Sequence, residues 1–363
     1  MRIWFASAEP PHLERESNLV VLLSYYDLQL TNIPFRKELW KLMKKKKKKV
    51  SLFLDSGAFS AFTQGIAIDI QEYIKFIKEH KEFIDIYANL DVIGNAKGTL
   101  KNQRIMEKAG LNPLPCFHQG EDYKYLKYYL DNYDYIALGG LAGNRYSTWE
   151  VFEHLTRCFQ EYICDQDGMP KVKVHGFGMT SWKFMRHFPW YSVDSTSWIL
   201  TGRNGSILMP RKRNGEYIYT EDPIKVNISN KSPKVKEAGK HLINFSKREQ
   251  EVILEYIKSK GFKVGESEIY DAPSKDYTLK EGEKWFGKEE ADSQREIIEI
   301  LHEYIPVVGW SKDKKIEKVI EEGLCNSYWL RDQLNLIYYL DFQNSIPKWP
   351  WPFKVKSKNL GVF

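Results

Sequence analysis

The sequence predicts an α/β fold in which eight parallel strands form a TIM-like (β/α)8 barrel. Eight short apolar runs occur in the first 200 residues, and most are continuously apolar, as in parallel strands covered on both faces. Amphipathic helical patterns separate most of these runs. Alternating strands and helices indicate a parallel sheet, and the count of eight favours a barrel over a doubly wound open sheet, an alternative that periodicity alone leaves open.

The predicted strands follow one another along the first part of the chain. In order they span 2–7, 18–25, 50–55, 84–90, 114–119, 135–139, 172–176 and 190–194. Helices are expected between them where apolar side chains recur three and four residues apart, at 35–43, 70–77, 123–130 and 149–164.

We divide the chain into three parts. Residues 1–205 hold the barrel strands and helices, residues 206–245 form a basic insertion after the eighth strand, and residues 246–363 hold the final barrel helix and a helical C-terminal extension. Weak strand patterns lie at 217–219 and 224–228. A helix at 245–259 begins with a capping box, Ser246 with Glu249. Helices are also expected at 289–304 and 315–341, with a break of the second near Cys325-Asn326 as an alternative. Residues 260–282 are expected to be loop, and 347–353 an irregular proline-rich tail.

Composition indicates a folded protein of a reducing compartment. Of 363 residues, 42% are hydrophobic, which suffices for a substantial core and argues against disorder. The net charge of +6 is compatible with a polyanionic partner without identifying one. Four cysteines without a C-x-x-C pair predict no disulfide framework. Without a signal peptide or a long apolar run, we expect a cytoplasmic protein that does not enter a membrane.

Six consecutive lysines, Lys44–Lys49, follow the helix predicted at 35–43. In a βα barrel the C-terminal ends of the helices lie opposite the face that carries the site. Lysines there interact favourably with the helix dipole. We therefore interpret the run as a solvated helix end in preference to a nucleic-acid contact.

Acidic, amide and glycine residues stand where successive strands end. A single acid there is typically an N-cap or turn residue. Five strand ends of this kind in order instead indicate a site for a polar, flat ligand. The residues are Asp55, Asp91, Gln119, Gly139 with Gly140, and Asp194.

Taken with their neighbours, these residues form ordered motifs over about residues 50–205. The motifs are Asp55-Ser56-Gly57-Ala58-Phe59, Gln119-Gly120, Gly139-Gly140-Leu141-Ala142, His175-Gly176-Phe177-Gly178, and Asp194 followed by Arg203. Together they resemble the tRNA-guanine transglycosylase (queuine tRNA-ribosyltransferase) superfamily. The resemblance is closest to its phage and bacterial branch, which places 7-deazaguanines into DNA.

The resemblance implies exchange of a guanine in nucleic acid for guanine or a 7-deazaguanine base. Asp194 would be the nucleophile at C1′, and Asp55 the second carboxylate, which handles the N9 proton of the base. Exchange with retained configuration requires this combination, because two inversions pass through a covalent glycosyl-enzyme. The implied substrate-binding residues are Ser56, Phe59, Asp91, Gln119, Gly139, Gly140, Leu141 and Arg203.

In detail, Asp91 would accept from the N1–H and amine of the base. Gln119 and the Gly140 amide would donate to its carbonyl oxygen, and the Leu141 carbonyl would face position 7. Phe59, Phe117 and Phe177 are candidates for stacking, although core packing is the commoner role of such residues. We interpret His118 and His175 as hydrogen-bonded structural residues.

One departure from the family concerns metal. Many members bind zinc through a cysteine motif after the nucleophile strand, but residues 195–324 contain no cysteine. We therefore expect no zinc there and no cofactor. This departure favours DNA over tRNA as the partner, with tRNA kept as an alternative, and leaves a homodimer open.

Two other functions remain as alternatives. One is a nucleosidase or glycoside hydrolase that uses the same two aspartates, and the other is a non-catalytic subunit that binds nucleic acid. The basic triplet Arg211-Lys212-Arg213 would line a nucleic-acid groove or form a solvated turn. Trp349 and Trp351 would stack on exposed bases or pack against the barrel.

Overall fold

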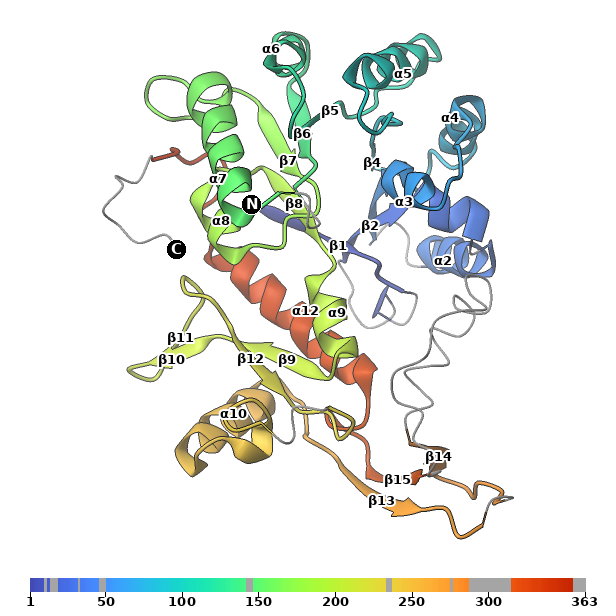
Figure 1. Ribbon diagram of the computed structural model, residues 1–363, viewed down its shortest axis with the longest axis vertical. Coiled ribbons are helices and arrows are strands. Elements are labelled where there is room, and N and C mark those ends of the chain that lie inside the picture. The colour runs from blue at the N-terminus through green and yellow to red at the C-terminus, as the bar shows by residue number, and fades with distance from the viewer. Residues whose placement is uncertain are drawn as a thin grey trace. The chain divides into compact units, whose positions relative to one another are not determined.

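The chain folds into two compact units. The computed structural model describes residues 1–9, 12–13, 19–31, 33–45, 50–141, 146–232, 237–274, 277–286 and 315–354. The first unit comprises Met1–Ser197 and Leu340–Phe363, and the second Trp198–Tyr339. The boundary between Tyr339 and Leu340 lies inside the helix α12 (Tyr328–Ser345), which is labelled in Figure 1.

The first unit contains the predicted eight-stranded parallel sheet. Its strands are β1 (Arg2–Ala6), β2 (Val20–Ser24), β3 (Ser51–Asp55), β4 (Ile86–Tyr87), β5 (Cys116–His118), β6 (Tyr135–Gly139), β7 (Lys173–Gly176) and β8 (Ser192–Ser195). They lie in the order β4-β3-β2-β1-β8-β7-β6-β5 and curl through 255°, which confirms a TIM-like half-barrel. An isolated parallel bridge between Ala88 and Leu114 links the two edges.

Large apolar side chains fill the inside of the curled sheet. Trp4 of β1 meets Phe53 of β3 edge to face, with ring centroids 5.4 Å apart. The buried cluster to which they belong comprises Trp4, Ala6, Leu22, Phe53, Ala88, Leu114, Cys116 and Ala137. Burial on both faces explains why these strands read as continuous apolar runs in the sequence.

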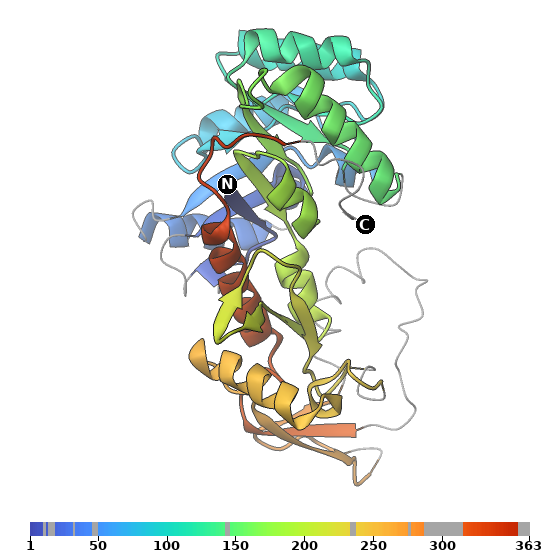
Figure 2. The ribbon, with the colours of Figure 1, turned by 90° about the vertical axis from the view of Figure 1, so that its left-hand side faces the viewer.

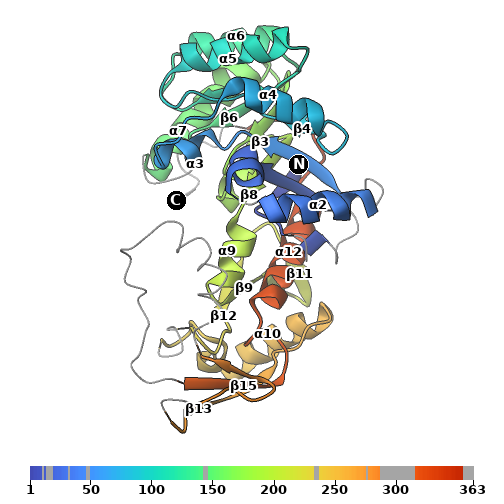
Figure 3. The ribbon, with the colours of Figure 1, turned by 90° about the vertical axis from the view of Figure 1, so that its right-hand side faces the viewer.

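Helices follow the strands and cover the outside of the sheet (Figures 1 and 3). They are α2 (Ile33–Lys45), α3 (Ala58–Thr63), α4 (Ile70–Glu79), α5 (Ala96–Lys108), α6 (Tyr123–Asn132), α7 (Thr148–Arg157) with its extension η2 (Cys158–Ile163), and α8 (Trp182–His187). The four helices predicted between the strands are confirmed. Sequence analysis missed α5, because Gly98 and Thr99 lower helix propensity in its first turn. The Asn95 side chain compensates by accepting from the Gly98 amide at 3.0 Å.

The second unit has a core of its own. After α9 (Ser197–Arg203), β9 (Ser206–Met209) pairs antiparallel with β12 (Ile224–Asn227), and β10 (Arg211–Arg213) pairs with β11 (Glu216–Ile218). The strands predicted at 217–219 and 224–228 are thus confirmed. The capping box of Ser246 and Glu249 starts α10 (Lys247–Ser259), as predicted.

The helix α10 packs within the second unit, whereas sequence analysis assigns it to the barrel. Its Ile253 and Ile257 join one buried cluster with Ile207 of β9 and Val226 of β12. Figure 2 shows α10 as the yellow-orange helix beside these strands. Its amphipathic pattern requires an apolar surface but does not specify which sheet provides it.

Two predictions for the C-terminal part are wrong. The helix expected at 315–341 begins only at Tyr328 as α12, and residues 315–321 form the strand β15 (Lys315–Glu321). The segment 260–282, expected to be loop, contains the strand β13 (Glu266–Asp271). With β14 (Glu283–Trp285) they form an antiparallel sheet in the order β13-β15-β14. Charged side chains hide the strand pattern of β13 and β15, and pairing between distant segments decides their conformation. The helix predicted at 289–304 lies outside the described residues.

The C-terminal tail packs against the first unit. Trp349 meets Tyr191 edge to face at 5.2 Å, Trp351 is buried, and the Phe353 amide donates to the Gly168 carbonyl at 2.8 Å. Packing is therefore the role that the structure gives to the two tryptophans.

At the predicted solvated helix end, Lys44 and Lys45 are exposed in the last turn of α2, and 46–49 lie outside the described residues. Within the described part of the chain, no helix has the length and apolarity to cross a bilayer.

Asn335 of α12 is expected to be essential for the stability of the second unit. It is fully buried, accepts from the Leu208 amide at 2.7 Å, and donates to the carbonyls of Trp198 and Ser206 at 3.1 and 3.2 Å. Asn335→Leu would leave three buried backbone groups without these partners, at about 1–3 kcal/mol each. We expect urea unfolding to show a loss of at least about 3 kcal/mol. The exposed Asn344→Leu on the same helix is the control, and equal stability of the two variants would contradict this role.

Candidate functional site

The C-terminal ends of the parallel strands form a rim that carries most of the predicted site residues. Asp55 ends β3, Asp91 follows β4, Gly139 ends β6 and Asp194 lies in β8. In a βα barrel this is the face on which ligands bind, because the loops that follow the strands converge there. The structure thus gathers on one rim residues that are up to 139 positions apart (Asp55 and Asp194).

Asp194 is buried and held in a fixed position. One of its oxygens, Oδ1, accepts from the Gly178 amide at 2.9 Å and lies 3.3 Å from His175 Nε2. The other ring nitrogen of His175, Nδ1, lies 2.7 Å from Ser192 Oγ, which orients the ring, whereas Nε2 makes no hydrogen bond to the described residues. Burial lowers the pKa of His175 although Asp194 acts to raise it, so the imidazole is neutral at neutral pH.

Asp55 has a different environment. Burial raises the pKa of Asp55 to about 7, and the nearby carboxylates of Asp91 and Asp194 contribute to the rise. The Gly57 amide donates to Asp55 Oδ2 at 3.2 Å and acts in the opposite direction. A carboxyl group with a pKa near neutrality can both give and take a proton at physiological pH. The rim therefore holds two carboxyl groups whose surroundings differ.

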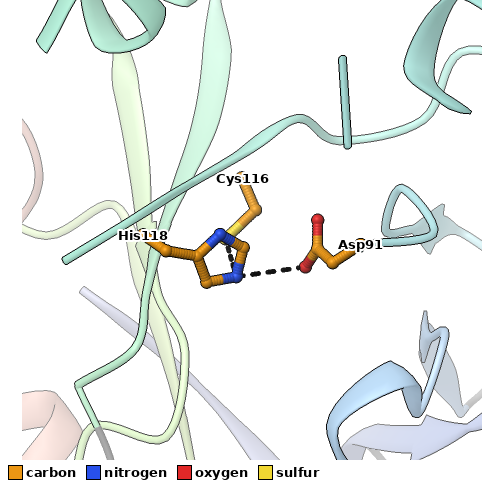
Figure 4. Close-up of side chains that lie close together, drawn as sticks. All are labelled: Asp91, Cys116 and His118. Atoms are coloured by element: carbon orange, nitrogen blue, oxygen red, sulfur yellow. Dashed lines mark hydrogen bonds and ion pairs between the residues drawn. The ribbon is translucent and has the colours of Figure 1, made fainter. Parts of the chain in front are cut away.

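Asp91, Cys116 and His118 lie together where β4 and β5 end (Figure 4). His118 Nε2 is 3.2 Å from Asp91 Oδ2 and 3.5 Å from Cys116 Sγ. On the other side of the ring, Nδ1 is 3.5 Å from Glu121 Oε1, while Glu121 Oε2 accepts from the His118 amide at 3.1 Å. Burial alone would lower the pKa of His118, but Cys116 and Asp91 raise it well above its ordinary value. Burial raises the pKa of the Cys116 thiol to about 12.

The local sequence explains this arrangement. Cys116 and His118 are two residues apart on β5, so their side chains point to the same side of the sheet. On the neighbouring strand Gly139 leaves room for them: a Cβ there would lie 2.7 Å from Cys116 Sγ and 2.9 Å from His118 Nε2. The next residue, Gly140, has a φ of 73°, a left-handed conformation that side chains rarely adopt.

Two buried acceptor atoms on this rim lack a hydrogen-bond partner among the described residues, namely Asp91 Oδ1 and Gln119 Oε1. A buried oxygen without a partner costs free energy, so such atoms are uncommon in folded proteins. A ligand with N–H groups would satisfy them.

The remaining predicted residues differ in their placement. Ser56 is buried and accepts from the Ala58 amide at 3.3 Å, so it shapes the turn after β3. Phe59 is 66% exposed on α3. Leu141 is partly buried, whereas Ala142 lies outside the described residues. Arg203 ends α9 in the second unit, and its role stays a prediction.

Of the other aromatic candidates, one is core and one is at the rim. Phe117 is fully buried and packs against Tyr123 at 5.5 Å, so its role is structural. Phe177 follows β7 and lies 4.5 Å from the His175 ring and 5.6 Å from the Phe53 ring. Phe177 is partly buried and packs against the apolar cluster inside the sheet, so these contacts are those of core packing.

Cys116, Glu121 and Ser192 were missed as site residues. A Cys-x-His pair on a predicted strand, and a Glu three residues after the His, were the available sequence signals.

The basic triplet Arg211-Lys212-Arg213 is paired within the second unit: Lys212 contacts Glu255 at 2.6 Å, and Arg213 and Arg211 contact Glu221 at 2.9 and 3.5 Å.

A basic stripe on α5 was also missed. Four exposed cations recur four, three and four residues apart, which places them on one helix face: Lys97, Lys101, Arg104 and Lys108. They line a surface cavity of about 560 Å³ along the helix. Near its start α5 is tied to the rim, because Thr99 Oγ1 accepts from the Val92 amide at 2.9 Å, next to Asp91. The cavity is a charged groove on the outside of the barrel, so we assign the chemistry to the rim instead.

Comparison with known proteins adds no assignment. A scan against protein-family models found no match, and a search of the curated proteins found no significant relative. The fold class is established by the structure, and the motif resemblance to guanine transglycosylases stays a prediction.

Proposed function

We propose that the protein is a transglycosylase that exchanges guanine in nucleic acid, preferentially DNA, for a 7-deazaguanine base. The observation that carries this proposal is the pair of carboxyl groups on one rim, Asp194 held by an amide and a neutral histidine, and Asp55 with a pKa raised to about 7. Glycosidic chemistry with a covalent intermediate needs this division between a nucleophile and a proton carrier.

In the proposed reaction, the Asp194 carboxylate attacks C1′ of the target nucleoside. The C1′–N9 bond breaks as the new C1′–oxygen bond forms, and protonated Asp55 gives its proton to the departing base. The incoming base then loses its N9 proton to Asp55, and N9 attacks C1′ while Asp194 leaves. Two inversions restore the original configuration, and Asp55 returns to its starting protonation state.

Recognition of the base is assigned to the acceptor atoms and to one aromatic ring. Asp91 Oδ1 is buried and lacks a partner among the described residues, so the N1–H and amine of guanine would satisfy it. Gln119 Oε1 is also without a partner there, so Gln119 is assigned an acceptor role beside the donor role that the resemblance implies. We assign stacking on a base that has left the helix to Phe177, a partly buried ring that follows β7. A base-binding pocket that supplies unsatisfied acceptors discriminates strongly against bases without the matching donors.

The basic stripe on α5 supports a nucleic-acid substrate. Its four cations lie along one face of α5, whose first turn is hydrogen-bonded through Thr99 to the Val92 amide. A row of cations suits contacts to successive phosphates. The preference for DNA follows from the sequence, which lacks the cysteine motif that many tRNA-modifying relatives in the resembled family carry.

Replacing Lys97 and Lys101 together by glutamine is expected to weaken DNA binding at every sequence. Each lost phosphate contact should reduce the slope of log K against log salt by about 0.9. A salt titration of binding measures this slope. Lys124 and Lys127, exposed on the next helix, provide the matched double variant, and an equal effect of both pairs would contradict a specific role for the stripe.

The direct test of the function uses labelled base. Double-stranded DNA, single-stranded DNA and tRNA are each incubated with the protein and labelled guanine or 7-deazaguanine, and label in the polymer is counted. The proposal predicts incorporation into DNA that exceeds incorporation into tRNA. Release of free base to water without incorporation would instead establish a hydrolase, and binding without either reaction would establish a non-catalytic subunit.

A further inference from the structure

We propose that Asp91, Cys116 and His118 form a binding site for a single Zn²⁺ ion on the barrel rim. Cys116 and His118 lie on β5 and Asp91 in the segment that follows β4, outside residues 195–324, where the resembled family would carry its zinc ligands. The inference goes beyond the proposed function and does not depend on it. Its evidence is the geometry of the three side chains and of the groups around them.

Two of the three separations between ligand atoms match those around a tetrahedral ion. His118 Nε2 lies 3.2 Å from Asp91 Oδ2 and 3.5 Å from Cys116 Sγ, and all three ligand atoms lie within 4.8 Å of one another. Bonds of about 2.0 Å to nitrogen and oxygen and about 2.3 Å to sulfur, at tetrahedral angles, place such atoms roughly 3.3–3.6 Å apart. The two separations from His118 Nε2 are close to this range, and binding of an ion would bring Asp91 and Cys116 to the same separation (Figure 4).

Hydrogen bonding satisfies the sulfur only weakly, because the acceptor for its S–H is the Phe117 carbonyl at 4.0 Å. His118 Nε2 carries at most one hydrogen, yet it faces both a carboxylate oxygen and a sulfur. Cys116 is 1% exposed, so its sulfur has little access to water. A cation would bind the imidazole lone pair, the thiolate and the carboxylate at once, with the thiol proton released to solvent.

The surroundings match those of metal-binding histidines. Glu121 Oε1 lies 3.5 Å from His118 Nδ1, on the side of the ring that faces away from the cluster. A carboxylate in this position fixes the tautomer that presents Nε2 to the metal and increases its basicity. Glu121 is itself held, because its other oxygen accepts from the His118 amide at 3.1 Å. Gly139 completes the site by leaving space where a Cβ would approach both sulfur and nitrogen.

The donor set identifies the class of ion. One thiolate, one imidazole and one carboxylate suit Zn²⁺, whereas Mg²⁺ and Ca²⁺ prefer oxygen ligands alone. Three protein ligands leave a fourth position for water or for an atom of the substrate. Asp91 binds through Oδ2 in this arrangement, so Oδ1 remains available as an acceptor for the base.

Cobalt provides the test, because a thiolate bound to Co²⁺ gives a charge-transfer absorption band. The full-length protein is stripped with chelator and titrated with Co²⁺ and then Zn²⁺, and bound metal is counted by mass spectrometry. We expect a charge-transfer band that saturates at one Co²⁺ per chain and is lost when Zn²⁺ replaces it. Saturation without a band would overturn the proposal.

Variants separate the site from an incidental cluster. Cys116→Ser should lose the band, and Glu121→Gln should keep it but bind about 10–100-fold more weakly. The control is Cys158→Ser, a buried cysteine 3.6 Å from His154 Nε2, which should bind like wild type. Circular dichroism confirms folding of each variant. Unchanged affinity in a folded Glu121→Gln variant, or a band that persists in Cys116→Ser, would refute the assignment.

Discussion

Asp194→Asn is expected to reduce base exchange by at least about 10⁴-fold, the scale of effect seen when a covalent nucleophile is removed. The asparagine is nearly isosteric, so its side-chain oxygen can still accept from the Gly178 amide and the fold should be preserved. What is lost is the negative charge that attacks C1′. Counting labelled base incorporated per chain measures the effect.

Two comparisons make this result specific. Binding of the DNA substrate should change little, because phosphate contacts carry most of the affinity. Asp165→Asn, at an exposed carboxylate, is the control and should exchange base normally. Exchange by Asp194→Asn within tenfold of wild type would show that this residue is not the nucleophile.

Asp55→Asn is expected to abolish exchange as well, but to stabilise the fold at neutral and alkaline pH. The folded-state pKa of Asp55 is raised to about 7 from the ordinary value of 3.8, mainly by burial. A raised pKa means that the folded state binds the proton more tightly than the unfolded state. The stability linked to Asp55 is therefore fully present below about pH 4 and is lost as the pH rises to about 7.

The asparagine does not titrate, so the free energy of unfolding of the variant should exceed that of wild type by an amount that grows between pH 4 and pH 7 and then stays constant. At about 1.4 kcal/mol per pKa unit, the shift would correspond to roughly 4 kcal/mol. Because Asp55 is partly exposed, we expect the asparagine variant to be about 2 kcal/mol more stable than wild type at pH 8. Urea unfolding of both proteins at pH 4.5 and pH 8 measures the difference. An equal difference at both pH values would contradict the shift.

The catalytic consequence of the same pKa is a pH dependence of the first half-reaction. Departure of guanine requires protonated Asp55, so formation of the glycosyl-enzyme should fall as the pH rises through about 7. Attack by the incoming base requires the carboxylate and should show the opposite trend. Single-turnover measurements of each half-reaction separate the two.

The barrel strands were predictable because burial on both faces leaves a local mark, a continuous apolar run such as that of β3 (Ser51–Asp55). The strand β15 was not, because its conformation depends on pairing with β13, more than 40 residues away in the sequence. The same distinction holds for helices: the cap of α10 is local and was predicted, but the sheet on which α10 packs is not encoded locally.

The candidate site was predictable to the same extent. Asp55 and Asp194 stand out because each ends an apolar run in an ordered set of motifs. The cluster of Asp91, Cys116 and His118 was not predicted, because it forms only when the two edges of the curled sheet meet at the Ala88–Leu114 bridge. The environments of the two aspartates are likewise tertiary, since they depend on the Gly178 amide, on His175 and on burial.

Trapping of a covalent protein–DNA adduct tests the central claim most directly. The protein is incubated with DNA that carries labelled guanine, without an acceptor base, and is then denatured and analysed by gel electrophoresis and mass spectrometry. Our account predicts one adduct per released guanine, linked through Asp194, which disappears when a 7-deazaguanine base is added. Release of guanine by wild type without an adduct, or an adduct that persists in Asp194→Asn, would contradict it.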